Sequence, residues 1–123
     1  MNSVTTTKVL DNLIVGVSAD DIVTDAGTLI TGQNLTRGAV LGKITASGKL
    51  TICDKAAVDG SAVPFAILAD DMDATSADKS VVVYLAGSFN QALLTFKSGT
   101  VAADVKDLAR GNGMYFINVY AAA

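Results

Sequence analysis

Residues 37–90 decide the fold and read RGAVLGKITASGKLTICDKAAVDGSAVPFAILADDMDATSADKSVVVYLAGSFN. Short apolar, β-type runs alternate in this stretch with turns of small residues. The runs AVLGKIT (39–45) and KLTIC (49–53) are separated only by Ala, Ser and Gly at 46–48. Since a glycine in a short loop between two such runs is typical of a β-hairpin, these runs predict two paired strands.

Two further runs are apolar at consecutive positions, SVVVYLA (80–86) and MYFINVY (114–120). Such a strand has apolar side chains on both faces and needs cover on both sides. A chain of 123 residues cannot easily supply two covering layers. The pattern therefore predicts that neighbouring subunits cover part of these strands.

The remaining elements are predicted from turn and cap signals. Strands are expected at 9–17 and, more weakly, at 22–30, where Asp25-Ala26-Gly27 interrupts the run. A turn is expected at Gly32-Gln33-Asn34, and a short strand at 65–69 that begins after Pro64, because proline does not sit centrally in a sheet. Residues 54–63 and the acidic segment 70–78 are expected to be loops.

One helix is predicted over 101–110. Thr100 is a suitable N-cap, and Val101, Val105 and Leu108 fall on one helical face. Arg110 would lie at the negative C-terminal end, with Gly111 in the left-handed cap. The sequence thus predicts a mainly β (β-rich α+β) fold, a small β-barrel-like or sandwich subunit with one short helix.

The composition favours a single domain that associates with other copies of itself or with a partner. Half of the residues are hydrophobic, which exceeds what one small core can hide, so part of this surface is expected in an interface. The net charge is −3 and the nine basic residues are scattered, so no nucleic-acid partner is expected. No apolar run is long enough to span a membrane. The polar start, residues 1–8, is either a frayed end or an arm that orders on a partner.

Groups that could carry catalysis are scarce. The sequence has no histidine, which excludes Ser-His-Asp and Cys-His sites and most zinc and iron sites. The one cysteine, Cys53, lies in an apolar run and is expected to be a buried, unreactive thiol. The acidic loop with Asp70, Asp71, Asp73 and Asp78 is interpreted as a solvated turn rather than a Ca²⁺ site. No enzyme activity, cofactor or metal is expected.

Many positions resemble a known family in order along the chain. They are GQNLTRG (32–38), VLGKIT (40–45), SGK (47–49), DGS (59–61), Pro64, AIL (66–68), Asp70-Asp71, Val83-Tyr84, Gly87, Asn90 and, more loosely, LAR (108–110). This pattern is similar to the bacteriophage head decoration proteins, the lambda-like capsid-stabilising family. The resemblance covers roughly residues 30–120 and includes no catalytic signature.

The resemblance implies a single head decoration domain over residues 1–123. It implies a homotrimer that binds the major capsid protein at threefold sites on the outside of the expanded icosahedral head and stabilises it against genome pressure. The protein would be made in the host cytoplasm and reside on the virion surface. The family's N-terminal segment contacts the capsid, which corresponds in kind to an arm of Asn2, Ser3, Val4, Thr5, Thr6, Thr7 and Lys8.

Two alternatives remain open from the sequence. One is another β-rich phage virion component, a minor capsid or tail part without a stabilising role. The other is a small hydrolase or lyase that uses Asp carboxylates, although such chemistry needs two carboxylates that flank a cleft.

Overall fold

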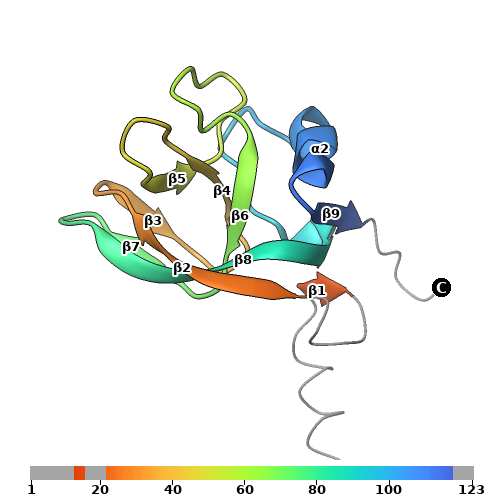
Figure 1. The fold of residues 1–123 in the computed structure, drawn as a ribbon, viewed down its shortest axis with the longest axis horizontal. Helices are drawn as coiled ribbons and strands as arrows, with labels where there is room; N and C mark the ends of the chain where they lie inside the picture. The colour runs from red at the N-terminus through yellow and green to blue at the C-terminus, as the bar shows by residue number, and fades with distance from the viewer. Residues whose placement is uncertain (1–12, 16–21, 118–123) are drawn as a thin grey trace, which may run out of the picture.

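The computed structural model describes residues 13–15 and 22–117. Five strands form a small mixed β-barrel: β2 (Val23–Leu29), β4 (Val40–Lys43), β5 (Leu50–Ile52), β6 (Pro64–Leu68) and β8 (Lys79–Asn90) (Figure 1). Their order is β8–β2–β5–β4–β6, and β6 pairs again with β8, which closes the barrel. Only the β2–β5 pair is parallel among these, and its register holds a single residue pair, Leu29 with Leu50.

The long strand β8 connects the barrel to the rest of the molecule. Its first part pairs with β2 and β6, and its last residues lie between β1 (Ile14–Val15) and β9 (Met114–Ile117). A 3-10 turn, η2 (Gln91–Leu93), follows β8, and helix α2 (Ala102–Gly111) packs against β9 and β6. A separate two-stranded sheet joins β3 (Gln33–Leu35) to β7 (Met72–Ala74) on the opposite side from α2 (Figure 1).

Alternation along the strands creates two cores. All five barrel strands contribute to the first core, with Leu41 and Leu68 among its fully buried members. The neighbouring residues Val40 and Ile67 point to the other side, where they meet Phe89, Val105 and Phe116 in a second core. The second core holds α2, β9 and the start of β1 on the barrel. Because side chains alternate across a strand, β4 and β6 serve both cores at once.

The predicted hairpin 39–53 is confirmed, with Leu41 opposite Ile52 and Lys43 opposite Leu50. The short strand predicted at 65–69 is confirmed as β6, although β6 includes Pro64 and ends at Leu68, and the loop over 54–63 is confirmed as well. The described part of the predicted strand 9–17 contains β1, and the other residues of that prediction lie outside the described residues. The mainly β architecture with one short α-helix is therefore correct at the level of fold class within the described chain.

Three loop assignments were wrong. Asp25-Ala26-Gly27 does not interrupt a strand, since β2 runs through it in register with β8. Gly27 suits this position because the side chain of Leu50 occupies the space where a Cβ would lie. Gln33 and Asn34 are in a strand, and the predicted acidic loop 70–78 contains its partner, β7.

Strands β8 and β9 each have one buried face and apolar residues on the other face, in line with the expectation that the chain cannot cover both faces by itself. Val81 and Val83 are buried while Val82 is 49% exposed, and in β9 Met114 and Phe116 are buried while Tyr115 and Ile117 are exposed. One layer of cover thus comes from the chain itself. On the second face, Val82, Tyr115 and Ile117 leave apolar surface exposed.

The helix begins one residue later than predicted. Val101 is the N-cap, and the Asp104 carboxylate accepts a hydrogen bond from its N–H at 2.9 Å. Thr100 is instead buried, where its hydroxyl accepts from the Lys55 N–H at 3.2 Å.

The predicted helical face was also shifted. The helix buries Ala102, Val105 and Ala109, while Val101 and Leu108 are exposed. Gly113 and not Gly111 has the left-handed φ, at 86°, because the helix continues through Gly111.

Candidate functional site

The arm predicted at Asn2, Ser3, Val4, Thr5, Thr6, Thr7 and Lys8 lies outside the described residues. The first residue after this segment that the structure describes is Leu13. Leu13 is 3% exposed and belongs to the core beside α2, and Ile14 pairs with Phe89. The Asn90 N–H donates to the Leu13 carbonyl at 2.7 Å. The chain is therefore anchored to the end of β8 at Leu13, five residues after the last residue of the predicted arm.

Strand β9 ends at the same place. It runs parallel to β8, with Ile117 opposite Asn90, while β1 runs antiparallel on the other side (Figure 1). Leu13 and Ile117 therefore flank Asn90 on either side. This end of the molecule, defined by Leu13, Asn90 and Ile117, is named the β8 end.

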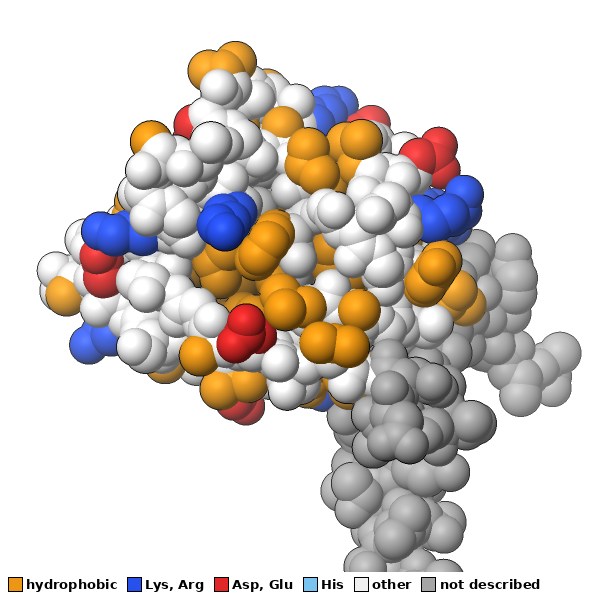
Figure 2. Space-filling view, in the orientation of Figure 1, with side chains coloured by type: hydrophobic (Ala, Val, Ile, Leu, Met, Phe, Trp, Pro, Cys, Tyr) orange, Lys and Arg blue, Asp and Glu red, His pale blue; other side chains and the backbone are white. Residues whose placement is uncertain are grey.

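Large apolar side chains are exposed at several places around the body. They are Val23, Val58, Val63, Val82, Leu93, Val101, Leu108, Tyr115 and Ile117. The face drawn in Figure 2 carries hydrophobic side chains in a central hollow, with charged side chains around it. Surfaces of this kind are used for contacts with other proteins.

A concave site lies between α2 and β9. It has a volume of about 210 Å³ and is lined by Lys106, Arg110, Met114, Tyr115, Phe116 and Ile117. It combines cationic and apolar side chains, which suits a contact with another protein segment better than it suits catalysis. Neither the helix pattern nor the strand pattern alone indicated this site, since it forms only where the two elements meet.

The cysteine is confirmed as a buried thiol. Cys53 is fully buried in the core beside α2, and its Sγ lies 3.5 Å from the Ala62 carbonyl oxygen. Burial, with a smaller contribution from the charge of Asp54, raises the pKa of the thiol to about 11. The thiolate needed for nucleophilic attack is therefore disfavoured at neutral pH.

The carboxylates of the acidic segment accept hydrogen bonds from groups of the chain around them. Asp71 accepts from the Arg37 N–H at 2.7 Å, and Asp73 accepts from the N–H and hydroxyl of Thr75. These hydrogen bonds lower the pKa of Asp73. Among residues 13–15 and 22–117, no three Cys or Asp side chains are grouped in a way that could hold a metal ion.

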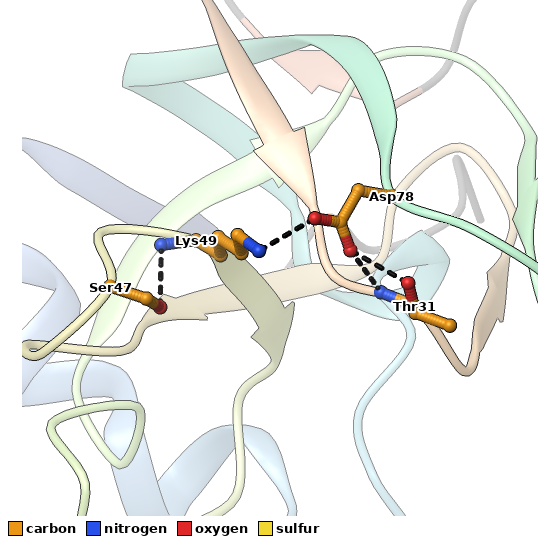
Figure 3. Close-up of polar contacts among 4 residues, drawn as sticks. All are labelled: Thr31, Ser47, Lys49 and Asp78. Carbon is orange, nitrogen blue, oxygen red and sulfur yellow. Dashed lines mark hydrogen bonds and ion pairs between the residues drawn. The ribbon is translucent and has the colours of Figure 1, made fainter.

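Asp78 connects three segments (Figure 3). One carboxylate oxygen accepts from the N–H and hydroxyl of Thr31 at 2.8 and 2.7 Å, and the other lies 2.6 Å from the Lys49 ammonium. The Lys49 N–H in turn donates to the Ser47 hydroxyl at 3.3 Å. These partners, with Lys49 first, hold the pKa of Asp78 at about 2. The role of Asp78 is therefore structural, because its contacts lie beside the place where β2 and β5 pair through a single residue pair.

Sequence reasoning missed a second polar contact. An Arg37 guanidinium nitrogen donates to the Tyr84 hydroxyl at 3.1 Å, and the guanidinium carbon lies 5.8 Å from the centre of the Tyr84 ring. Both residues lie in segments of the family resemblance, but no pattern in the sequence pairs positions 47 residues apart. This contact fixes the loop before β4 against β8.

Among the described residues, no helix is long and apolar enough to cross a membrane. Comparison with curated protein sequences gives no significant match. The family model of bacteriophage lambda head decoration protein D matches residues 3–112. The match spans most of the chain, including the β-barrel, α2 and most of the predicted arm. The chain therefore belongs to the lambda head decoration protein D family, and it is a non-enzymatic structural protein that resides on the phage capsid surface, binds the capsid and stabilises it.

Proposed function

We propose that this protein stabilises the expanded head as a homotrimer at threefold sites, with residues 2–8 as an arm that binds the major capsid protein. In this arrangement each trimer holds neighbouring capsid subunits together against the pressure of the packaged genome. The whole chain, 1–123, acts as one decoration domain, with residues 1–8 as its arm.

The anchoring of Leu13 is the observation that carries the role of the arm. Leu13 is buried, and its carbonyl accepts from Asn90 at the β8 end. A firm attachment at Leu13 transmits force from a bound arm directly into β8, the strand that β2 and β6 hold in the barrel. The family match begins at residue 3 and so includes nearly all of the proposed arm.

Uncovered apolar surface supports self-association. Val82 on β8 and Tyr115 and Ile117 on β9 are 49%, 46% and 38% exposed. Covering such side chains gives roughly 25 cal/mol per Å² of apolar surface removed from water. A threefold arrangement also matches the local symmetry of an icosahedral head, so that one trimer contacts three capsid subunits in equivalent ways.

The arm is tested by deletion of residues 2–8. Light scattering after size exclusion should give about three times the 12.5 kDa chain mass for both the full and the shortened chain. Titration of purified expanded capsids should show at least about tenfold weaker binding by the shortened chain, equivalent to about 1.4 kcal/mol. A monomeric mass would contradict the trimer, and equal capsid affinity would contradict the arm.

A further inference from the structure

We propose that the concave site between α2 and β9 is a second capsid-docking site, which accepts an acidic segment of the major capsid protein that also carries an apolar side chain. This site is named the α2–β9 groove and is lined by the six residues given above. The proposal rests on the arm-mediated docking proposed for the β8 end, and it adds a preformed contact on the folded body.

The shape of the α2–β9 groove suits a short peptide segment. Its volume is about 210 Å³, enough for one or two side chains. Met114 and Phe116 are buried in the core, while Tyr115 and Ile117 are partly exposed on the same strand. Met114 and Phe116 therefore fix the position of β9, while Tyr115 offers an exposed aromatic ring of the kind that is enriched in protein interfaces.

The charge of the groove sets the chemistry of its partner. Lys106 and Arg110 lie one helical turn apart on α2, and the lining residues include no carboxylate. Asp107 lies 3.5 Å from Arg110 but is 93% exposed, so this ion pair is weak. On a chain of net charge −3, a concave site with two cations is distinctive. Arginine can bind a carboxylate through two parallel hydrogen bonds, which favours an acidic partner.

The position of the groove indicates which protein supplies that segment. Ile117 lines the groove and also lies opposite Asn90, whose N–H holds Leu13. The groove is therefore continuous with the β8 end, from which the proposed arm reaches the capsid. A capsid subunit bound by the arm is held at high effective concentration near the groove, so even a weak contact there adds to the overall affinity.

The test uses the full chain with Lys106→Glu and Arg110→Glu together, and a second variant with both residues changed to Gln. The matched control is Lys79→Glu with Lys97→Glu, which alters the net charge equally at exposed positions outside the groove. Binding to purified expanded capsids is titrated at two salt concentrations, with melting and light scattering on the same samples.

The groove proposal predicts that the Glu variant binds capsids at least about tenfold more weakly at low salt, with trimer mass and melting temperature close to those of the unchanged protein. The capsid affinity of the Gln variant should lie between those of the Glu variant and the unchanged protein. The control should bind capsids within about threefold of the unchanged protein.

Unchanged capsid affinity of the Glu variant would overturn the inference. Loss of the trimer in that variant would overturn it too, because the groove would then hold a second copy. The shortened chain without residues 2–8, titrated in parallel, separates the two proposals: if only that deletion weakens binding, the arm stands and the groove fails.

Discussion

The Lys49 ammonium lies 2.6 Å from the Asp78 carboxylate, beside the seam where β2 and β5 meet. The second carboxylate oxygen of Asp78 is held by Thr31, which follows β2 (Figure 3). The seam itself has a single register pair, Leu29 with Leu50, and one further backbone hydrogen bond, from Ile30 to Leu50. Side-chain contacts at Asp78 thus supplement the shortest pairing in the barrel.

Asp78→Asn should lower the melting temperature at pH 7 by a few degrees. It should also make the melting temperature less dependent on pH in the acidic range. The pKa of Asp78 is about 2 in the folded protein, below its ordinary value of 3.8. Between these values the unfolded chain binds the extra proton, so this carboxylate stabilises the fold above about pH 4 and loses the effect as pH falls towards 2. The measurement is the melting temperature of the variant and of the unchanged protein at a series of pH values from 7 to 2. Asp107→Asn, on a side chain that is 93% exposed, is the control. Identical acid profiles for both variants would contradict the role of Asp78.

Val83→Asp should destabilise the protein by roughly 3 kcal/mol or more, because it buries an unpaired charge. Val83 is 1% exposed in the barrel core, whereas its neighbour Val82 is 49% exposed on the other face of β8. Ser80→Asp, at an exposed position on the same face of β8 as Val82 but outside the apolar surface proposed for self-association, is the matched control and should melt within a few degrees of the unchanged protein. Equal melting of the two variants would mean that the faces of β8 are assigned wrongly.

Gly42→Ala should cost about 1–3 kcal/mol. A Cβ at Gly42 would collide with the backbone of Ser61, where the loop 54–63 crosses β4. Gly111→Ala is the comparison, since a Cβ there meets nothing within 4 Å and alanine favours a helix by up to about 1 kcal/mol. Urea unfolding of both variants gives the sign of each effect. A stable Gly42→Ala protein would show that the loop does not rest on β4.

Cys53 should react very slowly with a thiol reagent in the folded protein at pH 8. The side chain is fully buried, and burial raises the pKa of the thiol to about 11. Unfolding in guanidinium should expose one reactive thiol per chain. The reaction can be followed by absorbance, and rapid labelling under native conditions would show that this part of the core opens readily.

Residues that alternate locally could be predicted from the sequence. The hairpin 39–53 has clear β-type runs around Gly48, whose φ is 74°, and the structure pairs the two runs as expected. The predicted burial of Cys53 also follows from its place in an apolar run.

Positions fixed by distant partners could not be predicted. Asp25-Ala26-Gly27 has weak β-propensity, yet pairing with β8 keeps it extended. Thr100 looks like a helix cap, but Lys55 uses its hydroxyl, and Asp104 caps the helix instead. The α2–β9 groove has the same origin, because Lys106 and Tyr115 meet only through the packing of α2 on β9.

The most direct test of the proposed trimer and its arm is an electron cryo-microscopy map of expanded capsids decorated with the full-length protein. We expect trimers on the outer surface at the threefold positions, with the β8 end towards the capsid and density for residues 2–8 continuing from Leu13 onto the major capsid protein. Bound protein at other symmetry positions, or a trimer whose β8 end points away from the capsid, would contradict the proposal.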